Sequence, residues 1–133
     1  MGIIGVHHTA LIVSDYGKAK RFYIDIMGFE QISEIYRADK ESYKLDLKAS
    51  DGSLIEIFTF PNPPARLIEP EACGLRHLAL KTSNLKETLQ CMKDQGVICH
   101  PIRFDDLTGK HFAFIDDPDG LPIELYEQCA DLG

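Results

Sequence analysis

Apolar and polar positions follow one order along the first half of the chain. β-Branched and apolar residues over about 4–13 predict a first strand. After Asp15 the pattern becomes helical, and Gly28 stands where a left-handed C-terminal cap requires glycine. The buried face of this helix is predicted to hold Ala19, Phe22, Tyr23 and Ile26. Further strands are predicted over about 30–36, 43–48 and 53–60.

The same order returns in the second half. Asn84 is a good N-cap, and Glu87 three residues later completes a capping box. Gly96 marks the end of this second helix. Its buried face is predicted to hold Leu85, Thr88, Leu89 and Met92. Strands are predicted over about 98–104, 110–115 and 121–127.

Sequence matches between the halves indicate an internal duplication. The frame Asp-Gly-x-x-Ile-Glu occurs at 51–56 and again at 119–124, and VHHTALIVSD near the start resembles LRHLALKTSN. We therefore predict one domain over 1–133, built from two repeats at about 6–60 and 75–128. A proline-rich linker over 61–74 joins them.

The predicted fold class is α+β. Each repeat is expected to be a βαβββ module, and one helix covers only one face of its sheet. We therefore expect two tandem modules whose curved sheets form a cup, with the helices outside.

Composition excludes several classes of protein. The net charge is −7 over 133 residues, which argues against a nucleic-acid or acidic-membrane surface. No apolar run is long enough to span a membrane, and the N-terminus does not resemble a signal peptide. The cysteines, which form no CxxC pair, are Cys73, Cys91, Cys99 and Cys129. We expect reduced thiols in a cytoplasmic protein, the cysteines being small core residues or bystanders.

Strand alternation brings four polar side chains to one face of their sheets. Side chains alternate with period two, so Glu56 lies opposite the apolar Ile55 and Ile57. The same argument holds for Glu124 between Ile123 and Leu125. His8 and His77 share the faces of Ala10 and Ala79, which leave room beside each imidazole.

Two imidazoles and two carboxylates in one concavity suit a divalent metal with open positions for water or substrate. The alternative for any single histidine is a packed core residue, and for any single glutamate an edge charge. The four together favour the metal, because two buried carboxylates without a cation would be strongly unfavourable.

The other histidines and the nearby cations are expected to be peripheral. His7 is expected on the opposite strand face from His8, and His100 and His111 at the surface or rim. Four cations could hold an anionic substrate near the mouth of the cup, although surface solvation is favoured for each: Arg37, Lys44, Arg103 and Lys110.

These motifs resemble a known family. HTALIV, LIEIF, RHLAL and DPDGLPIELYE are similar to the vicinal oxygen chelate superfamily of glyoxalase I type, and EACGLRHLAL resembles its short bacterial YaeR-like subgroup. The resemblance implies a metal held by His8, Glu56, His77 and Glu124. It also favours nickel over zinc, with cobalt, manganese or iron possible.

The resemblance implies a lactoylglutathione lyase-like enzyme. Such an enzyme chelates the vicinal oxygens of a small substrate and moves a proton through an enediolate, with Glu124 as the base and Glu56 as a ligand or second base. In glyoxalase I an Arg and an Asn grip glutathione, but the matching positions here are Ile12 and Phe60. The thiol carrier is therefore left open.

Two alternatives and one architectural question are also open. The chain could be another metal-dependent enzyme of the superfamily, namely an epimerase, a thiol transferase or a dioxygenase, or it could be a small-molecule or drug-binding module. A homodimer is expected, because unpaired sheet edges tend to be covered. The metal site could form within one chain or across that dimer.

Overall fold

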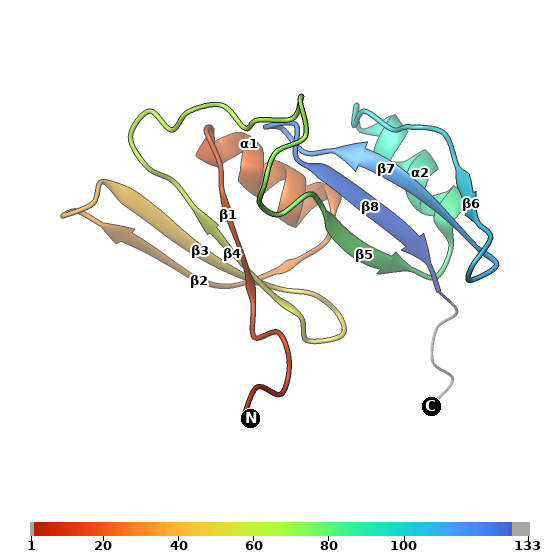
Figure 1. Ribbon diagram of the computed structural model, residues 1–133. Coiled ribbons are helices and arrows are strands. Elements are labelled where there is room, and N and C mark those ends of the chain that lie inside the picture. Colours follow the sequence, from red (N-terminus) through yellow and green to blue (C-terminus); the bar gives the residue numbers. More distant parts are fainter. Residues whose placement is uncertain (1, 129–133) are drawn as a thin grey trace. The chain divides into compact units, whose positions relative to one another are not determined.

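A computed structural model describes residues 2–128 of the chain. The chain divides into two compact units, Met1–Ala65 and Arg66–Gly133, each with its own sheet and helix (Figure 1). The boundary falls inside the proline-rich segment between the two repeats.

The first module forms a four-stranded sheet in the order β1-β4-β3-β2. β1 runs parallel to β4, and the other neighbours are antiparallel. In chain order its elements are β1 (Thr9–Ile12), α1 (Tyr16–Lys20), the π-helix η1 (Arg21–Ile26), β2 (Glu30–Arg37), β3 (Ser42–Lys48) and β4 (Leu54–Phe58).

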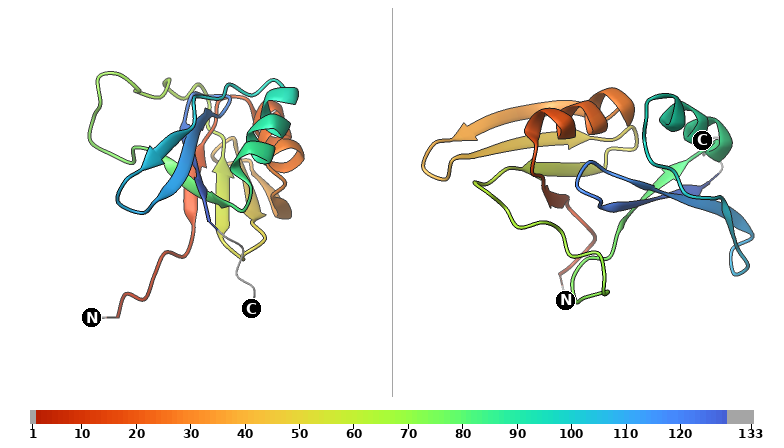
Figure 2. Two further views of the ribbon diagram at one scale, coloured as in Figure 1. Left: turned by 90° about the vertical axis from the view of Figure 1, so that its right-hand side faces the viewer. Right: turned by 90° about the horizontal axis from the view of Figure 1, so that it is seen from above.

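The second module repeats this topology as β5-β8-β7-β6, with β5 parallel to β8. Its elements are β5 (Leu78–Thr82), α2 (Leu85–Asp94), β6 (Arg103–Asp105), β7 (Lys110–Asp116) and β8 (Pro122–Glu127). In each module the helix lies against one face of the sheet (Figure 2). The predicted α+β class and the two βαβββ modules are confirmed.

The core of each module lies between its helix and the helix-facing side chains of its sheet. In the first module Leu45, Leu47 and Ile57 are fully buried, together with Tyr23 from η1. In the second module the buried strand residues alternate with half-buried ones, and they are Ala113, Ile115, Ile123 and Leu125. The alternation predicted for the central strands is therefore present in both sheets.

Local sequence signals explain where α2 begins and ends. The Asn84 side chain accepts a hydrogen bond from the backbone N–H of Glu87 and donates one to the Glu87 carboxylate. At the other end Gly96 has φ +83°. The N–H groups of Gly96 and Val97 bond back to Lys93 and Met92, as in a Schellman cap.

The first helix differs from a regular α-helix. After α1 the chain widens into the π-helix η1, where the Met27 N–H donates to the Phe22 carbonyl five residues back. Ala19, Phe22 and Tyr23 are buried as predicted, whereas Ile26 is only half-buried. Gly28 follows with φ +81°, the left-handed conformation predicted for it.

Two predicted strands are too long. The strand expected over 4–13 begins only at Thr9, because Thr9 pairs with Ile55 near the start of β4 and earlier residues meet no neighbouring strand. The strand expected over 98–104 is reduced to β6 and a bridge between Cys99 and Ile115. Pro101, which lacks a backbone N–H, interrupts the pairing between them.

The repeated Asp-Gly frame forms the turn before the last strand of each module. In both turns the glycine has positive φ, +92° at Gly52 and +81° at Gly120. A β-carbon on Gly52 would meet no atom within 4 Å, but one on Gly120 would lie 2.9 Å from Cδ1 of Ile68. In the second turn the Ile68 side chain therefore lies against Gly120.

Three of the four cysteines lie within the described residues. Cys73 and Cys91 are exposed and Cys99 is half-buried, and all three are free thiols, so only Cys99 has any core character. Burial raises the pKa of the Cys99 thiol above its ordinary value. Cys129 lies outside the described residues. Among residues 2–128 no helix is long and apolar enough to cross a membrane.

Replacing Ile57 by Ala should lower the free energy of unfolding by about 2–5 kcal/mol, because Ile57 is fully buried and truncation leaves a cavity. Ile35→Ala on β2 is the matched control. Ile35 is 53% exposed, so its truncation should cost less than about 1 kcal/mol. Urea denaturation measures both, and equal losses would contradict this description of the core.

Candidate metal centre

The carboxylates of Glu56 and Glu124 occupy equivalent positions in the two modules. Glu56 follows Ile55 on β4, and Glu124 follows Ile123 on β8, with both isoleucines buried on the helix side. Their side chains are 16% and 15% exposed on the opposite face. The parity argument therefore gives the correct face for both glutamates.

A histidine lies beside each glutamate. His8 precedes β1 and places its Nε2 2.8 Å from Oε2 of Glu56, while His77 precedes β5 and places its Nε2 3.0 Å from Oε2 of Glu124. The cause is the same register in both modules, since Ala10 pairs with Glu56 and Ala79 with Glu124. Each histidine stands two residues before its alanine, so it reaches over the small side chain.

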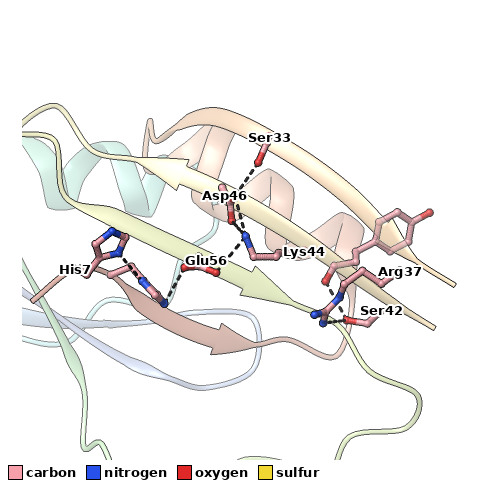
Figure 3. A network of polar contacts seen from close by, with 9 residues as sticks. His7, Ser33, Arg37, Ser42, Lys44, Asp46 and Glu56 are labelled. Carbon is pink, nitrogen blue, oxygen red and sulfur yellow. Dashed lines mark hydrogen bonds and ion pairs between the residues drawn. The ribbon is translucent and has the colours of Figure 1, made fainter. Parts of the chain in front are cut away.

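The Glu56 carboxylate belongs to a wider polar network (Figure 3). Nζ of Lys44 lies 3.3 Å from Oε1 of Glu56 and 2.8 Å from Oδ1 of Asp46. The Ser33 hydroxyl donates to Oδ2 of Asp46 at 2.8 Å. The prediction that Lys44 is simply a solvated surface residue is therefore wrong, because its ammonium group lies between two carboxylates.

Charge and hydrogen bonding in this network shift two pKa values. The hydrogen bond to Asp46 raises the pKa of Lys44, and Glu56 adds to the effect. Burial of Asp46 opposes ionisation, but hydrogen bonds from Lys44 and Ser33 outweigh it and hold the pKa of that carboxyl below its ordinary value of 3.8. The network is thus a cation held between two carboxylates, and it keeps Asp46 ionised below the usual pH.

In the second module a phenylalanine ring stands beside the pair instead. Phe114 pairs with Glu124 across the sheet, where Asp46 pairs with Glu56 in the first module. The His77 ring meets Phe114 edge to face, with centroids 5.2 Å apart. Over residues 2–128 the Nδ1 atom of His77 is buried without a hydrogen-bond partner. The two histidine–glutamate pairs are alike, but their surroundings differ.

Of the remaining histidines, His7 contacts one of the pairs, whereas His100 and His111 contact other acidic residues. The prediction that the His7 side chain lies on the opposite strand face from His8 is wrong, because Nδ1 of His7 lies 2.9 Å from Nδ1 of His8. The reason is that β1 starts only at Thr9, so strand alternation does not apply to His7 and His8. His100 bonds Asp116 at 3.0 Å and His111 lies 3.5 Å from Glu127, both as exposed side chains.

The donor set fits a divalent metal ion. Imidazole nitrogen and carboxylate oxygen are ligands for zinc, nickel, cobalt, manganese and iron, and a bound ion would add positive charge beside the partly buried carboxylates. In the described part of each module no third His, Cys, Asp or Glu joins the pair. Each module therefore supplies two candidate ligands.

Comparison with known proteins identifies the family. The Glyoxalase/Bleomycin resistance protein/Dioxygenase superfamily matches residues 5–125. The chain belongs to this superfamily. It is 51% identical to YwkD of Bacillus subtilis over 92% of this chain and 96% of that protein. It is 48% identical to YaeR of Escherichia coli over 96% and 99%, which confirms the predicted resemblance.

Solved structures agree. The crystal structure of SMU.1112c has a TM-score of 0.89 and 46% identity, covering 94% of this chain and 99% of that chain. More distant relatives differ in activity. A probable lactoylglutathione lyase of Vibrio cholerae is 30% identical over 90% of this chain and 88% of that protein. TnmS3, an antibiotic-binding protein of Streptomyces, has a TM-score of 0.75 and 25% identity over 96% and 98%.

Members of this superfamily are mostly enzymes that act on small molecules, and they typically bind a divalent metal ion. The matches above establish that this chain has the vicinal oxygen chelate fold and belongs to that family.

Replacing Lys44 by Met should raise the pKa of Asp46 toward 3.8, because the hydrogen-bonding cation is lost. The lowered pKa of Asp46 contributes stability that is complete above pH 3.8 and is lost as the pH falls through the folded-state value. The wild type should therefore lose more stability below pH 3.8 than the variant does. Carboxyl NMR titration and acid-dependent urea denaturation measure the two effects.

Lys48→Met is the control for this experiment, since Lys48 lies exposed on the same strand and the same face. An unchanged Asp46 pKa in Lys44→Met would contradict the network described above.

Proposed function

We propose that this protein is a metal-dependent enzyme of glyoxalase I type, a lactoylglutathione lyase-like isomerase of a small substrate with two vicinal oxygens. The observation that supports this function is the repeated histidine–glutamate pair. Both modules hold the pair at the same register position, at 2.8 and 3.0 Å, and with the carboxylate partly buried. Unrelated surface charges would not be expected to repeat in this way.

The proposed ligands of a single metal ion are His8, Glu56, His77 and Glu124. We favour nickel over zinc, as the resemblance to short glyoxalases implies, although the same donors accept cobalt, manganese or iron. When bound, the ion would act as a Lewis acid that stabilises negative charge on the substrate oxygens as a C–H proton leaves.

Glu124 is the proposed base. Oε2 of each glutamate is occupied by its histidine, but Oε1 of Glu56 also meets Lys44. Within residues 2–128 no cation lies within ion-pair distance of Oε1 of Glu124, and Arg76 acts on this carboxylate only at longer range. Oε1 is therefore available to accept the substrate proton and return it to the adjacent carbon. Glu56, held by Lys44, serves as a ligand or as a second base.

We propose that the thiol carrier of the substrate is either glutathione or another thiol. At the positions where the resemblance implies a glutathione grip stand Ile12, which is 59% exposed, and Phe60. A methylglyoxal–thiol hemithioacetal with another carrier is equally compatible. A homodimer is also proposed, because β1 and β5 each pair along one side only in the described chain.

A small-molecule binding module is the second candidate. The similarity to the antibiotic-binding protein TnmS3 favours it. Metal binding separates the two functions, since the binding-module hypothesis assigns no role to the four ligands.

Purified protein should take up about one divalent ion per chain, because the paired donors supply a four-ligand set. His77→Ala should abolish stoichiometric uptake, since it removes one nitrogen ligand. His100→Ala should not, because His100 pairs with Asp116 away from the site. Elemental analysis and calorimetry with nickel and zinc measure the uptake. Equal uptake by both variants would overturn the ligand assignment.

Metal-loaded protein should convert methylglyoxal with a thiol, either glutathione or a bacillithiol-type carrier, into a thioester detected by its absorbance. Glu124→Gln should lower kcat by roughly 10²- to 10⁴-fold, as expected for loss of a general base. Glu127→Gln is the control on the same strand, with metal content measured for each variant. No thioester with any thiol from a metal-loaded wild type would overturn the lyase function.

A further inference from the structure

The geometry points to a separate anion-binding subsite at Arg37, on the same sheet face as Glu56. We propose that it takes a carboxylate or phosphate group of the substrate, remote from the vicinal oxygens. The assignment to the substrate depends on the proposed function, whereas the anion-binding property of Arg37 does not.

Arg37 is held in place by two aromatic rings and a hydroxyl group. Its guanidinium carbon lies 5.1 Å from the centroid of Phe58 and 6.0 Å from that of Phe60, and the two rings stack at an interplanar angle of 11°. Nη2 donates to the Ser42 hydroxyl at 3.0 Å. The cation is thus fixed in orientation before any ligand binds.

This guanidinium has no anionic partner. Over residues 2–128 no carboxylate lies within ion-pair distance of Arg37, and its Nε is buried without a hydrogen bond. Nη1 also has no hydrogen-bond partner in the described chain. Lys44 on the same face is different, because Asp46 and Glu56 already neutralise it.

Such a cation is costly to leave without a partner. Removing a charged group from water without a partner is unfavourable, and stacking on aromatic rings offsets only part of that cost. An oxyanion approaching the terminal nitrogens would supply the missing charge. The planar guanidinium is well suited to this, since it can donate two parallel hydrogen bonds to a carboxylate or phosphate.

The second module lacks this feature. In the first module Arg37 at the end of β2 pairs with Ser42 of β3. At the equivalent position of the second module, Asp105 of β6 pairs with Lys110 of β7. Asp105 instead accepts a hydrogen bond from the Tyr126 hydroxyl at 2.9 Å. The duplication alone therefore does not explain Arg37, which is specific to the first module.

The position of Arg37 relative to Glu56 defines the substrate class. The ring under the guanidinium, Phe58, stands two residues beyond Glu56 on β4, or about 7 Å along the strand. Ile12 pairs with Phe58 on the other side. A ligand that reaches from Glu56 to Arg37 therefore passes Phe58 and the ion-paired Lys44, and it ends at a cation that has no anionic partner of its own in the described chain. We infer a substrate with an anionic group separated from its reacting oxygens by a short spacer.

Binding of a simple anion tests the subsite without any metal. In the metal-free protein the Nε–H resonance of Arg37 should be visible, because that group is buried, and it should shift on titration with inorganic phosphate or acetate. The resonance is assigned by its absence in Arg37→Met. A shift that saturates supports the subsite, and a resonance unmoved by both anions overturns it.

Two hydroxamates test the link to the substrate in the metal-loaded protein. One carries a carboxylate on a short methylene spacer, and the other is its methyl ester. In wild type the carboxylate form should bind roughly 10- to 100-fold more tightly, which is the gain expected from hydrogen bonds to a charged group. Arg37→Met should remove that preference, and Arg37→Lys should retain part of it.

Arg103→Met is the matched control, since Arg103 also lies over a ring, 5.3 Å from the centroid of Phe112, but in the other module. It should preserve the preference for the carboxylate. Thermal melts confirm that each variant folds. Equal binding of both hydroxamates by wild type overturns the substrate inference. If neither hydroxamate binds, the metal-dependent function fails, and the phosphate and acetate titration then decides the subsite alone.

Discussion

The candidate centre depends on the register between the first and last strand of each module. β1 and β4 are neighbours in space, although the rest of the module separates them in sequence, and they run parallel with Ala10 opposite Glu56. This pairing brings a histidine from before the first strand to a glutamate in the middle of the last. A shift by one residue would turn the glutamate into the core and separate the pair.

The two modules share this register but not the electrostatics around it. Glu56 lies in a network that contains its own cation, Lys44, whereas Phe114 stands across the sheet from Glu124. The candidate ligands are thus symmetric, but their neighbours differ, since Lys44 is ion-paired to Glu56 whereas Arg76 acts on Glu124 only at longer range. That difference supports the unequal chemical roles proposed for the two carboxylates, and it arises on the neighbouring strand rather than at the candidate ligands themselves.

The sequence was most informative where one periodicity governed a whole element. Alternation placed both glutamates correctly, and capping residues located the second helix, because these rules need only neighbouring residues. The sequence was misleading where a feature depended on a partner far along the chain. The first strand is shorter than its apolar pattern because β4 begins at Leu54, and the position of His7 follows from that. The pairing of Lys44 with Glu56 depends on strand order, which composition does not reveal.

The contact between Ile68 and Gly120 has a consequence for how the protein can diverge. A β-carbon at Gly120 would come within 2.9 Å of the Ile68 side chain, and the positive φ there disfavours other residues as well. Ile68 is 48% exposed and Cδ1 is the end of its side chain, so a change of rotamer could relieve that contact. The backbone conformation is the stronger constraint, and we expect residue 120 to remain glycine even in relatives whose residue 68 differs.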